Sequence, residues 1–179
     1  MIRYEDIKKF QSDGRYNVDV NISDLKRVLD DYKENYDLDL CPDFQRGNVW
    51  TDEQRTRYME FLLRGGNSAR TLYFNHPGWM TSMEGQMVCL DGLQRLTTVL
   101  MFLEGKVKVF GDNTIHDFED ECKKFKHRTW FKINVNNMKT REEILNWYID
   151  YNAGGTVHSE EEINRVRNLL KEEQDKKRK

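Results

Sequence analysis

An acid, a glycine and an arginine follow a short apolar run in the middle of the sequence. Asp91 and Gly92 come directly after residues 87–90, and Arg95 lies in a segment whose leucines recur at helical spacing. This pattern predicts a strand, a tight turn at Asp91-Gly92 and a helix that stops at Gly105. The first turn of a helix has unpaired N–H groups that favour an anion such as phosphate. The segment therefore predicts a phosphate site, although a plain turn beside a solvated arginine has the same pattern.

Two further polar clusters lie on expected loops. Gln45 and Arg46 follow Pro42, which interrupts regular strand pairing, and the run from Asn152 to Thr156 follows an expected helix. The two glycines in that run let the backbone approach a ligand closely, or simply turn a corner. Because loops on a rigid framework often hold binding groups, the chain has three candidate binding segments.

The other segments supply the framework that must position these clusters. Periodicity predicts a helix over residues 24–35 with Ser23 as N-cap, and a short helix over residues 117–125. Further helices follow capping boxes that begin at Thr51, Thr140 and Ser159. Strands are predicted over residues 71–74, 86–90, 106–110 and 130–135. His76 has no ligand-type neighbour in the sequence and is predicted to be a loop histidine.

Length and charge limit the classes of protein to consider. The 179 residues predict one domain over residues 1–170, with a polar tail over residues 171–179 that frays. Charged residues make up 34% of the chain but nearly cancel, at a net charge of -2, so composition makes no overall case for nucleic acid. A local basic cluster consists of Arg55, Arg57, Arg64 and Arg70, and a solvated surface is the commoner explanation for it.

Cysteine usage and hydropathy indicate the compartment. The 3 cysteines, Cys41, Cys89 and Cys122, are widely spaced and suggest neither a disulfide framework nor a metal-binding pair. The beginning of the chain does not resemble a signal peptide, and no apolar run approaches the roughly 18 residues of a membrane helix. We therefore expect a soluble, cytoplasmic protein that does not enter a membrane.

Taken in order, three motifs resemble one known family. Residues 42–54, Pro-Asp-Phe-Gln-Arg-Gly-Asn-Val-Trp-Thr-Asp-Glu-Gln, are similar to its first signature, Pro-x-Phe/Tyr-Gln-Arg-x-x-Val-Trp. Residues 90–98 are similar to Asp-Gly-Gln-Gln-Arg-Leu-Thr-Thr, and residues 148–156 are similar to Phe-x-x-x-Asn-x-Gly-Gly. The family is the ParB/sulfiredoxin-like domain that forms the N-terminal half of GmrSD-type restriction enzymes, which act on modified DNA.

The resemblance implies a fold and an activity. The fold is a compact α/β (α+β) domain in which helices surround a small mixed sheet and the three motifs meet around a nucleotide pocket. Relatives bind or hydrolyse nucleoside triphosphate to control DNA cleavage. Two departures matter: Leu93 replaces the first glutamine of the second motif, and the chain has no His-Asn-His cluster of the HNH nuclease type.

The resemblance also implies roles for individual residues. Asp91 and Gln94 are the catalytic candidates, and Asp91 is also the candidate ligand for Mg²⁺, which takes oxygen ligands and commonly only one or two carboxylates. The nucleotide-binding candidates are Gln45, Arg46, Gly92, Arg95, Thr98, Asn152, Gly154, Gly155 and Thr156. The alternative is structural, since Asp91 and Arg95 can also pair with one another.

Three functions are compatible with the sequence. The first is a nucleoside triphosphate-binding domain, with weak phosphohydrolase activity, that regulates DNA processing. The second is a non-catalytic module that binds DNA or a nuclease-bearing partner protein and interferes with a restriction system. The third is a ParB-like nuclease, which is least favoured because no second carboxylate or histidine lies close to Asp91 in the sequence.

Overall fold

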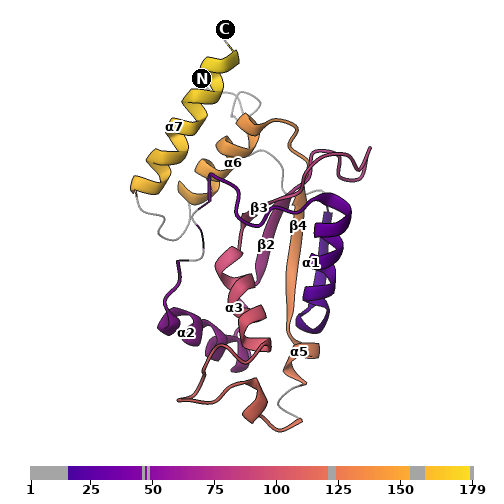
Figure 1. The fold of residues 1–179 in the computed structure, drawn as a ribbon, viewed down its shortest axis with the longest axis vertical. Coiled ribbons are helices and arrows are strands. Elements are labelled where there is room, and N and C mark those ends of the chain that lie inside the picture. The colour runs from indigo at the N-terminus through magenta and orange to yellow at the C-terminus, as the bar shows by residue number, and fades with distance from the viewer. Residues whose placement is uncertain (1–15, 46, 48, 121–123, 154–159, 178–179) are drawn as a thin grey trace, which may run out of the picture.

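A four-stranded mixed sheet lies at the centre of the computed structural model, which describes residues 16–45, 47, 49–120, 124–153 and 160–177 (Figure 1). The strands are β1 (Tyr16–Asn21), β2 (Thr71–Asn75), β3 (Val88–Asp91) and β4 (Trp130–Asn136), in the spatial order β1-β4-β2-β3. Strands β2 and β4 are parallel, whereas the β1–β4 and β2–β3 pairs are antiparallel. This arrangement confirms the small mixed sheet.

Helices surround the sheet, as predicted. They are α1 (Ile22–Tyr36), α2 (Asp52–Leu63), α3 (Leu93–Leu103), α5 (Phe125–Arg128), α6 (Arg141–Ala153) and α7 (Glu160–Lys177). Helices α6 and α7 lie at one end of the molecule, and α2 and α5 lie at the other (Figure 1). The capping box at Thr51 is confirmed, and reciprocal bonds between Thr140 and Glu143 confirm the one that begins α6.

The two faces of the sheet pack against different helices. Leu72 and Phe74 of β2 point to the face that α1, α2 and α3 cover, where they join the larger core cluster. Leu90 of β3 belongs to a second cluster with Tyr148 of α6 and Val166 of α7. Because successive side chains of a strand point to opposite faces, this sheet can be buried on both sides. The turn after β3 consequently lies within reach of α6.

Several boundaries differ from those predicted. Asn21 rather than Ser23 is the N-cap of α1, because the helix begins directly where β1 ends. The predicted helix over residues 117–125 is described only in part: a 3₁₀ turn spans Ile115–Asp117, Asp120 is helical, and the short α5 begins at Phe125. Residues 121–123, which include Cys122, and the capping box at Ser159 fall outside the described residues.

The predicted strand over residues 106–110 is wrong. Val107 and Val109 are buried, so the alternation is present, but within the described residues the segment pairs only through an isolated bridge from Val109 to Asn113. The backbone turns back immediately, with φ of 49° at Phe110 and 93° at Gly111. The alternating burial therefore arises because this segment is a loop that packs on the core. Within the described residues it does not lie along a strand of the sheet.

The end of the chain differs from expectation, and so does the burial of His76. Helix α7 continues to Lys177, well into the tail predicted to fray, and Gln174 donates a hydrogen bond to Glu142 of α6 at 3.1 Å. His76 is completely buried, with its ring 5.3 Å from that of Tyr36 and 5.7 Å from that of Trp79. It lies in the loop that follows β2, as predicted, but its side chain is part of the core. In the part of the chain that the structure describes, no helix combines the length and apolar character needed to cross a membrane.

Candidate functional site

The turn between β3 and α3 has the predicted form. Gly92 is buried and has a φ of 107°, which side-chain-bearing residues rarely adopt. A Cβ atom at this position would lie 2.5 Å from the Cδ2 atom of Leu72, a fully buried residue of β2. Helix α3 starts immediately, because the Gly92 carbonyl accepts the first helical hydrogen bond from Leu96 at 2.9 Å. The glycine thus allows the N-terminus of α3 to follow β3 without a longer loop.

Asp91 and Arg95 form an ion pair across this turn. The Arg95 Nη2 atom donates a hydrogen bond to the Asp91 Oδ2 atom, and the two side chains are 17% and 24% exposed, respectively. The pairing of Asp91 with Arg95, which the sequence left open as a structural alternative, is therefore present, and each group neutralises the other. Both side chains nevertheless remain partly accessible at the first turn of α3.

Gln94 joins the first motif to the second. Its Oε1 atom accepts hydrogen bonds from the backbone N–H groups of Val49 and Trp50, each at 3.0 Å. Its Nε2 atom donates to the carbonyl of Gly47 at 2.7 Å. The side-chain amide is thereby engaged on both its oxygen and its nitrogen with the backbone of the preceding loop. This geometry favours a positioning role, and a catalytic role for Gln94 stays a prediction.

The first motif is also attached to β3 and α6. The Gln45 Nε2 atom donates to the carbonyl of Cys89 at 2.6 Å, and this hydrogen bond holds the loop of the first motif beside β3. Phe44, next to it, is 2% exposed and packs edge-on against Tyr148 with ring centroids 5.4 Å apart. The loop of the first motif is therefore held by residues from both of the other motifs.

Arg165 of α7 also binds the loop of the first motif, and the sequence did not predict this role. Its Nη1 and Nη2 atoms donate to the carbonyls of Asp43 and Phe44 at 2.6 and 2.8 Å. Arg141 of α6 contacts both carboxylate oxygens of Asp43, at 2.9 and 2.6 Å. Neither arginine lies in a motif, and both occur in charge-rich helices where a solvated position is the ordinary expectation. No sequence signal singles them out.

The described parts of the three motifs thus lie together around the loop of the first motif. The chain matches the model of one family, the N-terminal domain of the GmrSD restriction endonuclease, over residues 25–179. The chain belongs to this family. No curated protein and no solved structure matches it. The likeness of this GmrSD N-terminal domain to the ParB and sulfiredoxin folds stays a prediction from the sequence resemblance.

Some predicted site residues of the GmrSD domain bond within their own helices. The Thr98 hydroxyl donates to the Gln94 carbonyl at 2.7 Å, and the side chain is fully buried. The Asn152 amide donates to the Tyr148 carbonyl at 2.7 Å and is also buried. Both therefore have structural partners. The remaining predicted residues, Arg46, Gly154, Gly155 and Thr156, fall outside the described residues, so their roles stay predictions.

An aromatic cluster lies beside the ion pair and was not predicted as part of the site. Tyr151 stacks on Trp147, with ring centroids 4.6 Å apart and an interplanar angle of 10°, and its ring lies 4.9 Å from that of Tyr73. Burial raises the pKa of Tyr151, and the negative charge of Asp91 raises it further. Tyr73 is the strand partner of Asp91, so the ring of Tyr151 that packs on Tyr73 lies on the same side of the sheet as the carboxylate. The helix preceding the glycine pair brings this flat ring to the turn.

A divalent cation fits Asp91 only together with a ligand. Among the described residues, no three His, Cys, Asp or Glu side chains converge on one point. Mg²⁺ commonly binds through one or two carboxylates plus substrate phosphates, and Asp91 provides one partly exposed carboxylate. Its Oδ1 atom has no hydrogen bond within the described part of the chain. The donor set therefore fits Mg²⁺ that arrives with a phosphate.

Proposed function

We propose that this domain binds a nucleoside triphosphate at the β3–α3 turn and uses binding, with slow hydrolysis, to regulate the processing or restriction of modified DNA. One observation carries the proposal: the loop of the first motif and the described end of α6 both pack around a turn that presents a partly exposed arginine in the first turn of α3. Helix N-termini and arginine forks are both suited to phosphate oxygens. Membership of the GmrSD family supports the connection to DNA restriction.

In this proposal the ion pair is exchanged when the nucleotide binds. Arg95 turns from Asp91 to a phosphate, and the Asp91 carboxylate becomes available to Mg²⁺. Mg²⁺ supplies charge neutralisation at the phosphates. The ring of Tyr151, which packs against Tyr73, the strand partner of Asp91, offers a flat surface on which the base stacks. Gln45 and Gln94 hold the backbone of the first motif against the turn.

Titration with the four ribonucleoside triphosphates, each with and without Mg²⁺, tests the proposal. Binding to the folded state raises the free energy of unfolding by about 2.7 kcal/mol when the free ligand is at 100 times its Kd. We therefore expect a rise in melting temperature with at least one triphosphate, and a larger rise with Mg²⁺ present. An unchanged melting temperature with all four, at millimolar concentration, would contradict the proposal.

Replacing Asp91 by Asn is expected to separate binding from turnover. Asparagine keeps the shape and one acceptor oxygen but removes the charge that pairs with Arg95, so the arginine is left free for phosphate. We expect the Kd for triphosphate to change by less than about tenfold, which is about 1.4 kcal/mol. We expect phosphate release with Mg²⁺ to fall to the level of a blank without protein, because the carboxylate is lost.

A matched control for this variant is Asp30→Asn. Asp30 pairs with Lys26 at 2.6 Å, also four residues apart, but on the exposed surface of α1. The control removes a comparable ion pair without touching the site, so it should leave both affinity and phosphate release unchanged. Phosphate release by Asp91→Asn at the parent rate would refute the role of Asp91.

The ion pair also favours a second candidate function. Because Asp91 and Arg95 neutralise each other, the turn is satisfied without a ligand, as a non-catalytic module would require. Such a module would bind DNA or a nuclease-bearing partner. If the parent protein binds triphosphate but releases no phosphate with Mg²⁺ and DNA present, this second function replaces the enzymatic one.

A further inference from the structure

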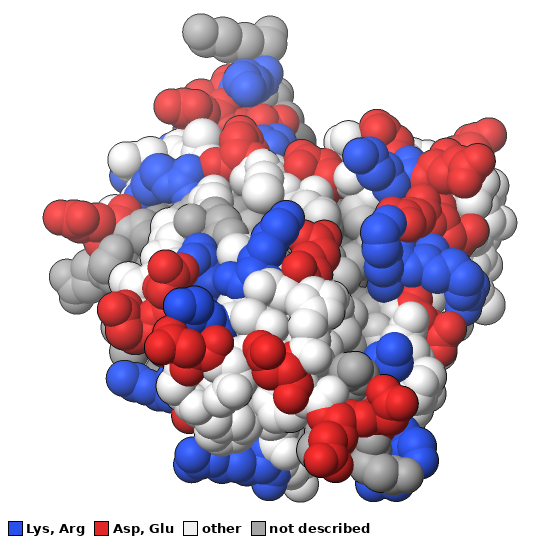
Figure 2. Space-filling view, turned by 60° about the horizontal axis from the view of Figure 1, so that its bottom comes forward, with Lys and Arg blue, Asp and Glu red and all other residues white. Residues whose placement is uncertain are grey.

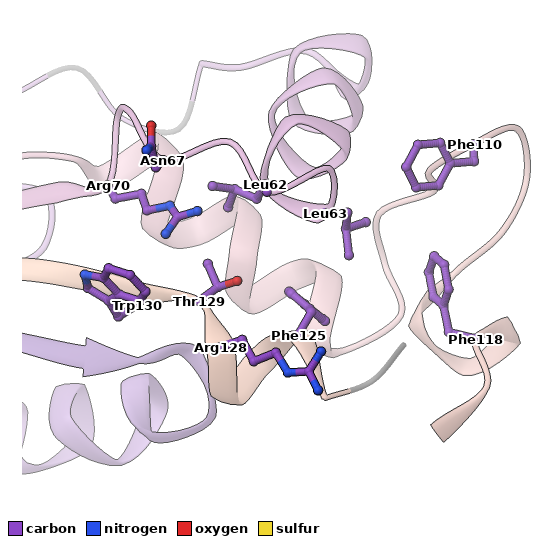
Figure 3. A pocket seen from close by; sticks show the side chains of 11 residues that line it. Leu62, Leu63, Asn67, Arg70, Phe110, Phe118, Phe125, Arg128, Thr129 and Trp130 are labelled. Atoms are coloured by element: carbon purple, nitrogen blue, oxygen red, sulfur yellow. The ribbon is translucent and has the colours of Figure 1, made fainter. Parts of the chain in front are cut away.

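A cavity of about 590 Å³ lies at the end of the molecule that carries α2 and α5 (Figure 3). Its walls come from the end of α2, the loop over residues 65–70 that follows it, Phe110, Phe118, α5 and the start of β4. None of the predicted nucleotide-binding residues lines it. Phe110 and Phe118 follow the C-terminal end of α3, whereas Asp91 and Arg95 flank its N-terminal end. Since 11 helical residues extend about 16 Å, these walls are well separated from the β3–α3 turn.

Two arginines supply the positive charge of this cavity. Arg70 donates from Nη2 to the Gly66 carbonyl, and its buried Nε atom has no hydrogen-bond partner within the described residues. Arg128 is exposed at the end of α5. In the described part of the chain, no carboxylate forms a salt bridge with either arginine. Acidic and basic side chains are otherwise interspersed over the face seen in Figure 2. An anion would therefore be attracted by these two arginines at short range, and not by a net positive charge of the whole face.

Aromatic side chains supply the rest of the lining. Trp130 and Phe110 are 43% and 41% exposed, although aromatic side chains of this size are usually buried. The Arg70 guanidinium lies 5.3 Å from the centroid of the Trp130 ring. Phe118 and Phe125 form the deeper wall and pack on Phe102 of α3, with centroids 6.3 and 5.8 Å away. Flat apolar faces and guanidinium groups therefore open into the same space (Figure 3).

We infer that this cavity is a second binding site, for a nucleotide unit that consists of a flat base and a phosphate. Arginine forks bind phosphate oxygens bidentately, and exposed aromatic rings stack on bases of any sequence. An inorganic anion would leave the aromatic faces exposed, and a purely apolar ligand would leave the charges of Arg70 and Arg128 without an anion, since no described carboxylate forms a salt bridge with them. The volume falls in the range of about 300–1,000 Å³ that is usual for small-molecule sites. The unit comes either as a free mononucleotide or as an unpaired nucleotide of single-stranded DNA.

Calorimetric titration of the full chain with three probes tests this inference. The probes are deoxycytidine monophosphate, a single-stranded oligodeoxynucleotide, and a duplex of the same sequence. We expect binding of the mononucleotide, of the single strand, or of both, and weaker binding of the duplex because its bases are already stacked. Binding of the mononucleotide identifies a free nucleotide as the source, whereas binding of the single strand alone identifies nucleic acid.

Two variants connect this binding to the cavity. Arg128→Gln and Phe110→Ala are each expected to raise the Kd about tenfold, by loss of a phosphate contact and of a stacking surface. Both side chains are exposed, so the fold should survive, and melting curves without ligand would verify this. Arg167→Gln, an exposed arginine on α7, is the matched control and should leave the Kd within twofold.

Two results would overturn the inference. The first is the absence of binding for both the mononucleotide and the single strand at millimolar concentration. The second is binding that Arg95→Ala abolishes while Arg128→Gln and Phe110→Ala leave it unchanged, because the probes would then occupy the β3–α3 turn. Loss of triphosphate binding alone would contradict the proposed function and leave this second site standing.

Discussion

Arg95→Ala is expected to raise the Kd for nucleoside triphosphate about 100-fold, which is about 2.7 kcal/mol. Arg95 is the described arginine at the first turn of α3, and hydrogen bonds to charged groups contribute about 1.5–3 kcal/mol. Without its guanidinium, the helix N-terminus is the one phosphate-binding group left at the turn among the described residues. The rise in melting temperature that triphosphate produces in the parent should therefore fall, in the variant, to the part that binding in the cavity beside Arg128 contributes.

The apo form of this variant distinguishes binding from structure. Removal of Arg95 breaks its pair with a carboxylate that is 24% exposed, so we expect a loss of only about 1 kcal/mol in the free energy of unfolding. Arg167→Ala, on the exposed side of α7, should change neither stability nor the response to nucleotide. A variant that unfolds without ligand would identify Arg95 as structural. A folded variant with the parental response would remove it from the site.

Gly92→Ala is expected to lower the free energy of unfolding by about 3 kcal/mol. Two effects add: a side chain at a φ of 107° is strained, and the new Cβ atom would lie 2.5 Å from the Leu72 Cδ2 atom. Leu72 is completely buried, so it cannot move away without disturbing the core. Urea unfolding followed by circular dichroism measures the change.

Two other glycines separate the strain from the clash. Gly111 has a φ of 93°, but no atom lies within 4 Å of the place that a Cβ atom would take, so Gly111→Ala should cost only about 1 kcal/mol. Gly47 also has open space and no positive φ, so Gly47→Ala should have almost no effect. Equal losses for Gly92→Ala and Gly111→Ala would show that the contact with Leu72 is unimportant.

The sequence alone determined the local elements and the segments that form the candidate site. The strand, turn and helix around Asp91-Gly92 were predictable because hydrophobic spacing and a glycine act within a few residues of one another. The capping box at Thr51 was predictable for the same reason. The order of the three motifs identified the family, which the match over residues 25–179 confirms.

The tertiary structure alone decided which partners these residues have. Gln94 bonds to Gly47, 47 positions away, and Arg165 bonds to Asp43, 122 positions away, and no local pattern marks such pairs. Tyr151 likewise joins the site only because α6 covers the second face of the sheet. The segment over residues 106–110 has the alternation of a strand, but a strand also needs a partner alongside it, and among the described residues only Asn113 pairs with this segment. Periodicity reports which side of a segment is buried, and only the packed chain decides what lies against it.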